Sequence, residues 1–238
     1  MSESILDIQD LEVSRGEVGQ AYEVSLSSLK LEAGDVAAIV GPSGCGKSTL
    51  LEAIGLLLEP RSVKHFQLVD FDIALDMTCS LRERERRWSR VRQHYLGFVP
   101  QSGGLLPFLN VKDNIELPRK MVGCSDSDSL LEEVIERLQL SPLMRRSPAQ
   151  LSIGERQRVS FVRAIAHRPK LLLADEPTAA LDPVLAKELF ALIVEIASAF
   201  KVAALIVTHE WSLVEAVGIK SIVGTVGQQR RTSFNASA

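Results

Sequence analysis

At residues 41–49 the chain reads Gly41-Pro42-Ser43-Gly44-Cys45-Gly46-Lys47-Ser48-Thr49. An apolar run at 36–40 precedes this stretch and a helix-forming run at 50–54 follows it, which is the strand, loop and helix order of a phosphate-binding loop. The small residues let main-chain N–H groups turn inward, and the positive end of the helix dipole attracts an anion. A glycine-rich turn that binds nothing is the alternative interpretation.

Two residues of this loop predict the chemistry of a nucleotide site. Lys47 is placed to reach the outer phosphates as a point charge. Ser48 is placed to ligate the Mg²⁺ that accompanies a nucleotide, because Mg²⁺ takes few protein oxygens and shares its other positions with phosphate and water. Cys45 stands where a small residue is needed, so we expect it to pack rather than to react.

The composition is typical of one globular unit. The chain has 238 residues, of which 46% are hydrophobic, and its net charge of −3 argues against nucleic-acid binding through a general basic field. No apolar run approaches the roughly 18 residues that cross a bilayer, and residues 1–4 lack the character of a signal peptide, so we expect the protein to stay where it is made. Three widely spaced cysteines without a CxxC pair indicate neither a disulfide framework nor a zinc site.

Hydrophobic periodicity predicts strands that alternate with helices. Apolar and polar residues alternate in three sections, at 5–13, 24–31 and 66–77, and the first two indicate antiparallel strands. Continuous apolar runs predict strands at 36–40, 96–99, 171–174 and 203–207, and helical spacing predicts a helix at 183–200. The tail 227–238 is polar, and we expect it to be frayed. This order predicts an α/β fold with a parallel sheet, in which one core, 1–101 and 169–238, carries an inserted helical subdomain at 102–168.

An arginine-rich run covers residues 80–92. Its composition is compatible with a nucleic-acid patch, but Glu83 and Glu85 interrupt it. Because Leu81, Trp88 and Val91 recur at helical spacing, we favour an exposed amphipathic helix over a nucleic-acid surface.

Two further strand ends carry polar residues. The strand 171–174 is followed by Asp175 and Glu176, at the sheet edge where open α/β folds bind their ligands. Asp175 suits the Mg²⁺ shell, and Glu176 is placed to orient and deprotonate a water aimed at a γ-phosphate, unless the pair merely forms a turn. His209 follows the strand 203–207 and is placed to hydrogen-bond the γ-phosphate, although a histidine there is more often structural.

These motifs resemble, in their order along nearly the whole chain, the ATP-binding cassette (ABC) ATPase family. The corresponding elements are the Walker A loop 41–49, the Q-loop glutamine Gln101, the signature segment 151–155, the Walker B strand 171–176, the D-loop Ala180-Leu181-Asp182 and the switch histidine His209. The resemblance implies a P-loop NTPase core with an N-terminal antiparallel β section and the inserted helical subdomain, all within a single nucleotide-binding domain at 1–238.

The resemblance also implies a site that two subunits share. In one subunit the Walker A loop and Gln101 bind ATP, Mg²⁺ is held by Ser48, Gln101 and Asp175, and catalysis falls to Glu176, His209 and Lys47. The other subunit is expected to contribute its signature and D-loop residues, which are Ser152, Ile153, Gly154, Glu155 and Asp182.

The implied function is that of an ATP-hydrolysing motor subunit of an ABC transporter, a homodimer that closes around two ATP·Mg and drives a separate integral-membrane permease. Residues 97–101 and 105–115 look like the lipoprotein-releasing and macrolide-efflux branch, and the region 102–114, which includes Phe108, is where such a permease would bind. The implied location is cytoplasmic, peripheral on the cytoplasmic face of the inner (plasma) membrane, without a nucleic-acid partner. The alternatives are a soluble non-transport ABC ATPase that acts as a nucleotide-dependent switch, and a P-loop kinase or GTPase, which leaves 151–155 unexplained.

The sequence departs from the family pattern at two places. The family signature is usually Leu-Ser-Gly-Gly-Gln, and here Ile153 and Glu155 replace a glycine and the glutamine. Ser152 and Glu155 still fit a capping box, but the bulk of Ile153 and the charge of Glu155 near an anion predict slower hydrolysis. Arg15 stands at the place of the aromatic residue that stacks on adenine in the family, and Tyr22 is the nearest substitute.

Overall fold

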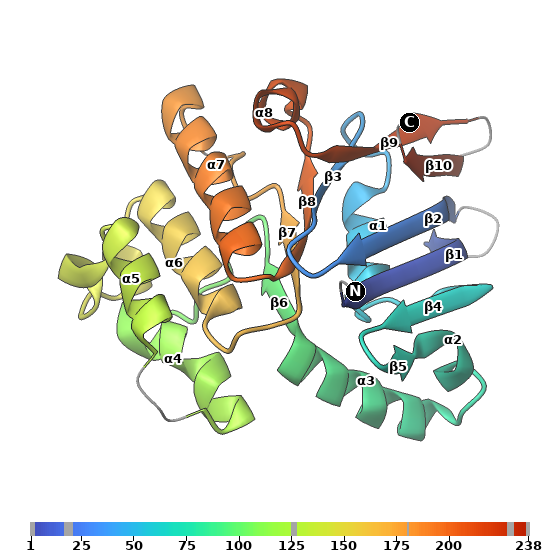
Figure 1. Cartoon of the computed structure of the whole chain (residues 1–238), viewed down its shortest axis with the longest axis horizontal. Coiled ribbons are helices and arrows are strands. Elements are labelled where there is room, and N and C mark those ends of the chain that lie inside the picture. The colour runs from blue at the N-terminus through green and yellow to red at the C-terminus, as the bar shows by residue number, and fades with distance from the viewer. Residues whose placement is uncertain (1–2, 17–20, 125–127, 180, 228–230, 237–238) are drawn as a thin grey trace.

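The computed structural model describes residues 3–16, 21–124, 128–179, 181–227 and 231–236. Its centre is a ten-stranded mixed sheet with the order β5-β4-β1-β2-β10-β9-β3-β8-β7-β6 (Figure 1). The sheet combines a parallel part, which the apolar runs predict, with an antiparallel arm, which the alternating segments predict. The predicted α/β class is confirmed.

The parallel part contains five strands. They are β3 (Val36–Val40), β6 (Leu96–Val99), β7 (Leu171–Asp175), β8 (Ala203–Thr208) and β9 (Lys220–Val226). The antiparallel arm is formed by β1 (Ser4–Arg15), β2 (Tyr22–Glu32), β4 (His65–Leu68) and β5 (Phe71–Asp72). The strand β10 (Arg231–Ala236) joins the two parts, because it pairs parallel to β2 and antiparallel to β9.

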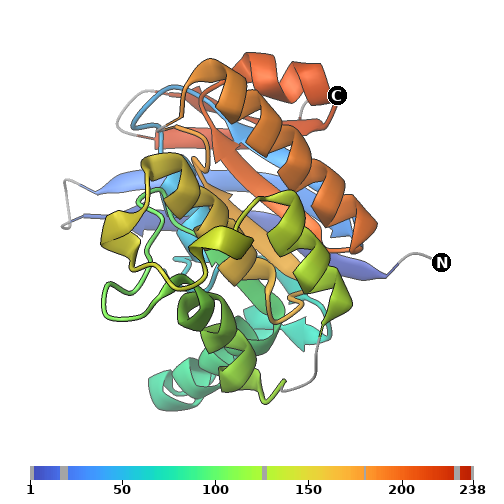
Figure 2. The same ribbon diagram turned by 90° about the vertical axis from the view of Figure 1, so that its left-hand side faces the viewer.

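The helices pack on both faces of the sheet. They are α1 (Lys47–Ile54), α2 (Ile73–Asp76), α3 (Leu81–Tyr95), α4 (Val111–Val122), α5 (Ser129–Arg137), α6 (Ile153–Ile165), α7 (Pro183–Ala199) and α8 (Trp211–Val217). Two short 3₁₀ helices lie between α5 and α6, at Ser141–Leu143 and Pro148–Gln150. Figure 2 shows α4 to α7 gathered on the side of the sheet away from the antiparallel arm.

The alternation of side chains along β3 divides the interior into two apolar cores. Ala37 and Ile39 face a core that includes α1, α3 and the strands of the arm. Ala38 and Val40 face a second core, which α4 to α8 complete. A strand buried on both faces carries a continuous apolar run, which is why residues 36–40 have no polar member.

Helix α3 confirms the amphipathic interpretation of the arginine-rich run, with one correction. Trp88 and Val91 are buried, and so is Arg84, whose guanidinium lies 5.4 Å from the centroid of the Trp88 ring and donates to Glu59. Leu81, expected on the apolar face, is 64% exposed. It is the first residue of the helix and extends beyond the core that receives the later turns.

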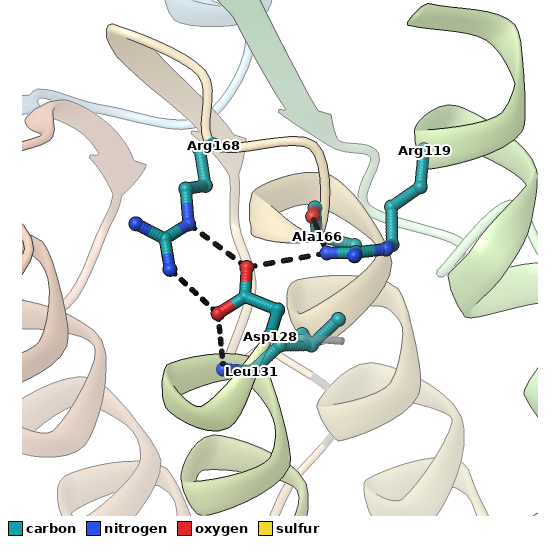
Figure 3. Close-up of polar contacts among 5 residues, drawn as sticks. All are labelled: Arg119, Asp128, Leu131, Ala166 and Arg168. Atoms are coloured by element: carbon teal, nitrogen blue, oxygen red, sulfur yellow. Dashed lines mark hydrogen bonds and ion pairs between the residues drawn. The ribbon is translucent and has the colours of Figure 1, made fainter. Parts of the chain in front are cut away.

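The helical segment between β6 and β7 is held together by Asp128, the N-cap of α5 (Figure 3). Its carboxylate accepts two hydrogen bonds from Arg168, at 2.8 and 2.6 Å, and one from Nη1 of Arg119 at 3.2 Å. The same Nη1 atom of Arg119 donates to the carbonyl of Ala166 at 3.1 Å. One acidic side chain therefore links α4, α5 and the loop that follows α6.

One further prediction about local structure is wrong. The tail was expected to be frayed, but β10 is a six-residue strand in which Thr232 and Phe234 are fully buried. The alternating section 66–77 contains most of β4 and all of the short strand β5, and Asp72 then caps a helical turn by accepting from the amide of Leu75 at 2.9 Å. Within the described parts of the chain, no helix combines the length and the apolar character needed to span a bilayer.

Candidate nucleotide-binding site

The loop between β3 and α1 is shaped around Gly46, the N-cap of α1. Gly46 has a φ of 92°, in the left-handed region. A Cβ atom at this position would lie 2.5 Å from Cγ2 of Val24 and 3.1 Å from Cε1 of Tyr22, so only glycine fits. Because a glycine N-cap has no side chain that caps the helix, the first-turn amides of α1 suit an anionic ligand.

Lys47 carries a positive charge into this loop. Its side chain is only 5% exposed, and Nζ donates to the main-chain oxygens of Gly41 and Pro42, each at 3.0 Å. The ammonium group therefore lies under the loop at the place where phosphate oxygens are expected. Cys45 is buried beside it, at 2% exposure, which confirms that this thiol packs.

Ser48 and Asp175 meet across the end of the sheet. The hydroxyl of Ser48 donates to Oδ1 of Asp175 at 3.0 Å, although the residues are 127 positions apart. Burial raises the pKa of Asp175 above its ordinary value, and the hydrogen bond from Ser48 opposes this rise. A hydroxyl and a carboxylate form an all-oxygen pair of the kind that Mg²⁺ accepts beside phosphate and water, so the residues fit that ion.

Glu176 lies at the convergence of three strand ends. Its Oε2 atom accepts from Nε2 of Gln101 at 3.1 Å, and its Oε1 atom is 3.3 Å from Nδ1 of His209. The main chain of Glu176 has a φ of 45°, which is rare for a residue with a side chain, and its amide donates to the carbonyl of Val207 at 3.0 Å. Strain of this kind concentrates at functional sites.

The signature segment lies at the beginning of α6. Ser152 and Glu155 form the predicted capping box: the amide of Ser152 donates to Oε2 of Glu155 at 2.6 Å, and the amide of Glu155 donates to Oγ of Ser152 at 3.2 Å. The first of these bonds lowers the pKa of Glu155. Ile153 is 50% exposed, and a Cβ on Gly154 would lie 3.1 Å from Leu181 of the D-loop.

The remaining D-loop residue in the described chain is a helix cap. Asp182 accepts from the amides of Val184 and Leu185, at 3.1 and 3.2 Å, and so begins α7. Ala180 lies outside the described residues. In the described part of the chain, no hydrogen bond joins the signature residues 152–155 to the loop 41–49.

The region 102–114 presents an exposed aromatic side chain on a braced loop. Phe108 is 78% exposed. The fully buried Asn114 holds the main chain on both sides of Phe108: it accepts from the amide of Leu106 at 2.8 Å and donates to the carbonyls of Leu106, Leu109 and Asn110 at 3.0 to 3.1 Å. Sequence reasoning missed this asparagine, because a polar residue within a helical pattern gives no sign that its partners are loop carbonyls.

Tyr22 lies beside the glycine loop, as its candidacy for adenine stacking requires. Its ring contacts the position of Gly46, and its hydroxyl bonds to Oγ1 of Thr232 in β10. Arg15, which the resemblance aligns with the stacking aromatic of the family, pairs with Glu52 at 2.7 Å.

Comparisons with known proteins agree with this geometry. The sequence profile of the family described as ABC transporter matches residues 24–179. The chain is similar to the lipoprotein-releasing system ATP-binding protein LolD of Ruegeria sp. (strain TM1040), with 39% identity over 217 residues that cover 90% of this chain and 92% of the relative. It is also similar to LolD 2 of Caulobacter vibrioides, with 37% identity over 216 residues that cover 90% and 91%.

Among solved structures, the chain is similar to the dimeric post-hydrolysis state of the ATP-binding cassette MJ0796 bound to ADP and Pi. That similarity has a TM-score of 0.74 and 25% sequence identity, and it covers 92% of this chain and 94% of the other. The chain therefore belongs to the ABC transporter family, in which it is an ATPase that couples ATP hydrolysis to transport.

Proposed function

We propose that this chain is the motor of an ABC transporter of the lipoprotein-release or efflux type and works as a homodimer on a separate permease. The similarity to the LolD proteins supports the type of transporter, and the similarity to a dimeric cassette supports the homodimer. The observation that carries the proposal is the convergence of Gln101 and His209 on the carboxylate of Glu176, next to the Ser48–Asp175 pair.

The loop 41–49 binds the phosphates of ATP in this proposal. Its amides and the N-terminus of α1 surround the anion, and Lys47 exchanges its two loop carbonyls for phosphate oxygens. Tyr22, whose ring already lies against Gly46, is the candidate for stacking on the adenine.

Three side chains at this end of the sheet would hold Mg²⁺ through their oxygen atoms. Ser48 and Asp175 are the principal candidates, and Gln101 is the third. When bound, Mg²⁺ supplies positive charge that neutralises the β- and γ-phosphate oxygens. The raised pKa of Asp175 means that its carboxylate gains from a cation, because a positive ion nearby favours the charged form.

Glu176 orients and deprotonates the attacking water, and His209 contacts the γ-phosphate. Phosphoryl transfer to water needs little covalent chemistry, so positioning and charge neutralisation provide most of the rate. A second subunit, placed head to tail, completes each site with its residues Ser152, Gly154 and Asp182, and closure of the dimer brings them to the nucleotide.

Ile153 and Glu155 make this second half of the site less favourable than the usual signature. Ile153 adds an exposed side chain where main chain is expected to approach phosphate. The carboxylate of Glu155, fixed on the amide of Ser152, adds negative charge at the same helix end. Both features favour slower hydrolysis without loss of the fold.

The permease binds at the region 102–114, with Phe108 as its central contact. An exposed aromatic side chain on a loop that Asn114 holds in place is suited to a hydrophobic docking contact. The protein then lies peripherally on the cytoplasmic face of the inner membrane. The core 1–101 and 169–238 and the helical part 102–168 act as two parts of one nucleotide-binding domain, with the Q-loop between them.

Affinity purification from detergent-solubilised membranes tests this function. The tagged chain is expected to co-purify with an integral-membrane permease, identified by mass spectrometry, and the complex is expected to hydrolyse ATP faster when a lipidated protein substrate is added. The same membranes without the tagged chain are the control. Recovery of no membrane protein, together with ATP hydrolysis by the isolated chain, would leave the enzyme in place but refute the permease partner.

A further inference from the structure

We infer that Gln157 is a positioning residue for ATP hydrolysis, through which helix α6 holds Gln101 against the carboxylate of Glu176. The inference rests on the proposed roles of Gln101 and Glu176. Neither the sequence motifs nor the similarities assign a function to Gln157.

The side chain of Gln157 binds the turn that carries Gln101. It is only 4% exposed, and Nε2 donates to the main-chain oxygen of Gln101 at 2.9 Å, across 56 positions of sequence. Its Oε1 atom is buried and accepts no hydrogen bond from the described residues. The bond to Gln101 is therefore the polar anchor of this buried amide within the described chain.

This bond continues directly into the catalytic group. The residue whose carbonyl Gln157 holds is the residue whose side chain donates to Oε2 of Glu176 at 3.1 Å. Gln101 itself is exposed, in a turn that follows β6, so it has little packing to fix its position. An anchor on its main chain consequently restricts where its side chain reaches.

The turn and the helix also lie close to each other beside this bond. A Cβ on Gly103 would lie 3.8 Å from the main-chain oxygen of Arg156, the residue before Gln157. Because Gln157 is about 7.5 Å of helix rise beyond Ser152, movement of the signature end of α6 is transmitted to Gln101 through a rigid helix. Helix α6 therefore connects the signature residues, which are proposed to contact the other subunit, with the carboxylate of Glu176 in its own subunit.

The chemistry requires a hydrogen-bond donor at this position. The acceptor is a carbonyl, so an amide N–H faces it, whereas a carboxylate oxygen would repel it. Gln157→Glu replaces the donor by an acceptor at nearly constant volume. Gln157→Met keeps an unbranched side chain of similar length and removes the donor without adding charge.

A matched control lies on the same helix. Ser160 is fully buried in α6, and its Oγ atom also has no hydrogen-bond partner among the described residues. Ser160→Ala thus changes a buried polar group of the same helix without touching Gln101.

The experiment measures kcat and KM for ATP hydrolysis, the affinity for a fluorescent ATP analogue, and Tm, for the full chain and the three variants. Both Gln157 variants are expected to lose kcat by about fivefold or more, with KM and nucleotide affinity close to wild type. Tm is expected to stay close to wild type in Gln157→Met and to fall in Gln157→Glu, which places a carboxylate in a buried position. Ser160→Ala is expected to match wild type in all four quantities. A lower kcat in the Gln157 variants than in Ser160→Ala, at unchanged nucleotide affinity, would show that Gln157 positions a reacting group.

Two outcomes overturn the inference. One is an unchanged kcat in both Gln157 variants, and the other is a parallel loss of kcat, nucleotide affinity and Tm in Gln157→Met, which indicates a purely structural residue. If either result is obtained while the wild type is active and the Glu176→Gln variant is inactive, only the role of Gln157 is refuted and the proposed catalytic site stands. An inactive wild type, or an active Glu176→Gln variant, refutes the proposed catalytic site instead.

Discussion

Nε2 of Gln101 donates a hydrogen bond to Oε2 of Glu176 at 3.1 Å, and 75 positions of sequence separate the two residues. His209 meets the other carboxylate oxygen at 3.3 Å. A carboxylate that is held at both oxygens has a defined orientation, which is what a group that directs a water molecule requires.

The first prediction concerns the charge of this carboxylate. Glu176→Gln preserves its shape and removes the base, so hydrolysis is expected to slow by at least about 100-fold while ATP binding persists. An ATP-bound dimer is then expected to accumulate, as measured by light scattering during size-exclusion chromatography. Glu215→Gln, on the exposed face of α8, is the control and should behave as wild type. Only monomers in the presence of ATP would contradict the two-subunit site.

The second prediction concerns the raised pKa of Asp175. A carboxyl group whose pKa rises on folding binds its proton more tightly in the native state, so its ionised form opposes folding at neutral pH. Asp175→Asn is expected to raise Tm of the nucleotide-free protein by roughly 2 °C at pH 7.5 and to abolish ATPase activity. The gain in Tm should shrink as the pH falls through the folded-state pKa of Asp175. Thermal unfolding across a pH series measures this, and a lower Tm at every pH would refute it.

The third prediction concerns Asp128, between Arg168 and Arg119. The hydrogen bonds from Arg168 hold the pKa of Asp128 well below its usual range, so this carboxylate stabilises the fold above pH about 4 and loses its effect as the pH falls further. Asp128→Asn is expected to lower the free energy of unfolding by about 2 kcal/mol at pH 7 and by less at acid pH.

Urea denaturation at several pH values measures this loss. Asp113→Asn is the control, because its partner Lys120 is 3.8 Å away and both side chains are exposed. Its expected effect is below about 0.5 kcal/mol. Equal effects of the two substitutions would show that Asp128 does not hold the helical segment together.

The fourth prediction concerns the unusual signature. The combined change Ile153→Gly and Glu155→Gln is expected to raise kcat several-fold, because it removes bulk and negative charge from the end of α6. Gln keeps the capping geometry with Ser152, so the helix is expected to persist at a cost of about 1 kcal/mol from the glycine. Steady-state phosphate release measures the effect. An unchanged turnover would mean that neither residue impairs the signature.

The fifth prediction concerns Phe108. Phe108→Asp is expected to abolish permease binding and transport while the ATPase activity of the isolated chain persists, because a charge replaces the central apolar contact. Leu81→Asp is the control, since Leu81 is also exposed and is the first residue of a helix, where an acidic residue is tolerated. Pull-down with the permease and a transport assay measure the effect. Normal coupling in the Phe108 variant would refute the docking surface.

The sequence predicts the parts of this molecule that depend on local pattern. Apolar runs identify β3, β7 and β8, and the Ser152–Glu155 spacing identifies the capping box before α6. The arrangement of the proposed catalytic residues can also be predicted from the sequence, since strand ends of a parallel sheet meet at one edge. That edge does bring Ser48 to Asp175, and Gln101 and His209 to Glu176.

The features that the sequence did not predict depend on contacts between residues that are distant along the chain. Helix α4 was expected only as part of the helical subdomain 102–168, and its bounds were not predicted because Pro118 interrupts its pattern. In the structure, Asn110 caps this helix and Asn114 binds it to the preceding loop. The hydrogen bond from Gln157 to Gln101 could not be predicted from the sequence either, because it joins residues far apart along the chain.

The strand β10 has a further consequence for biosynthesis. It lies between β2 and β9, so within the described sheet it joins the β1–β2 hairpin, which is synthesised first, to the parallel strands. A nascent chain on the ribosome thus cannot complete this sheet before residue 236 has emerged, and until then β2 and β9 present open edges that invite wrong pairing. Shielding by a chaperone during translation would matter most in that interval.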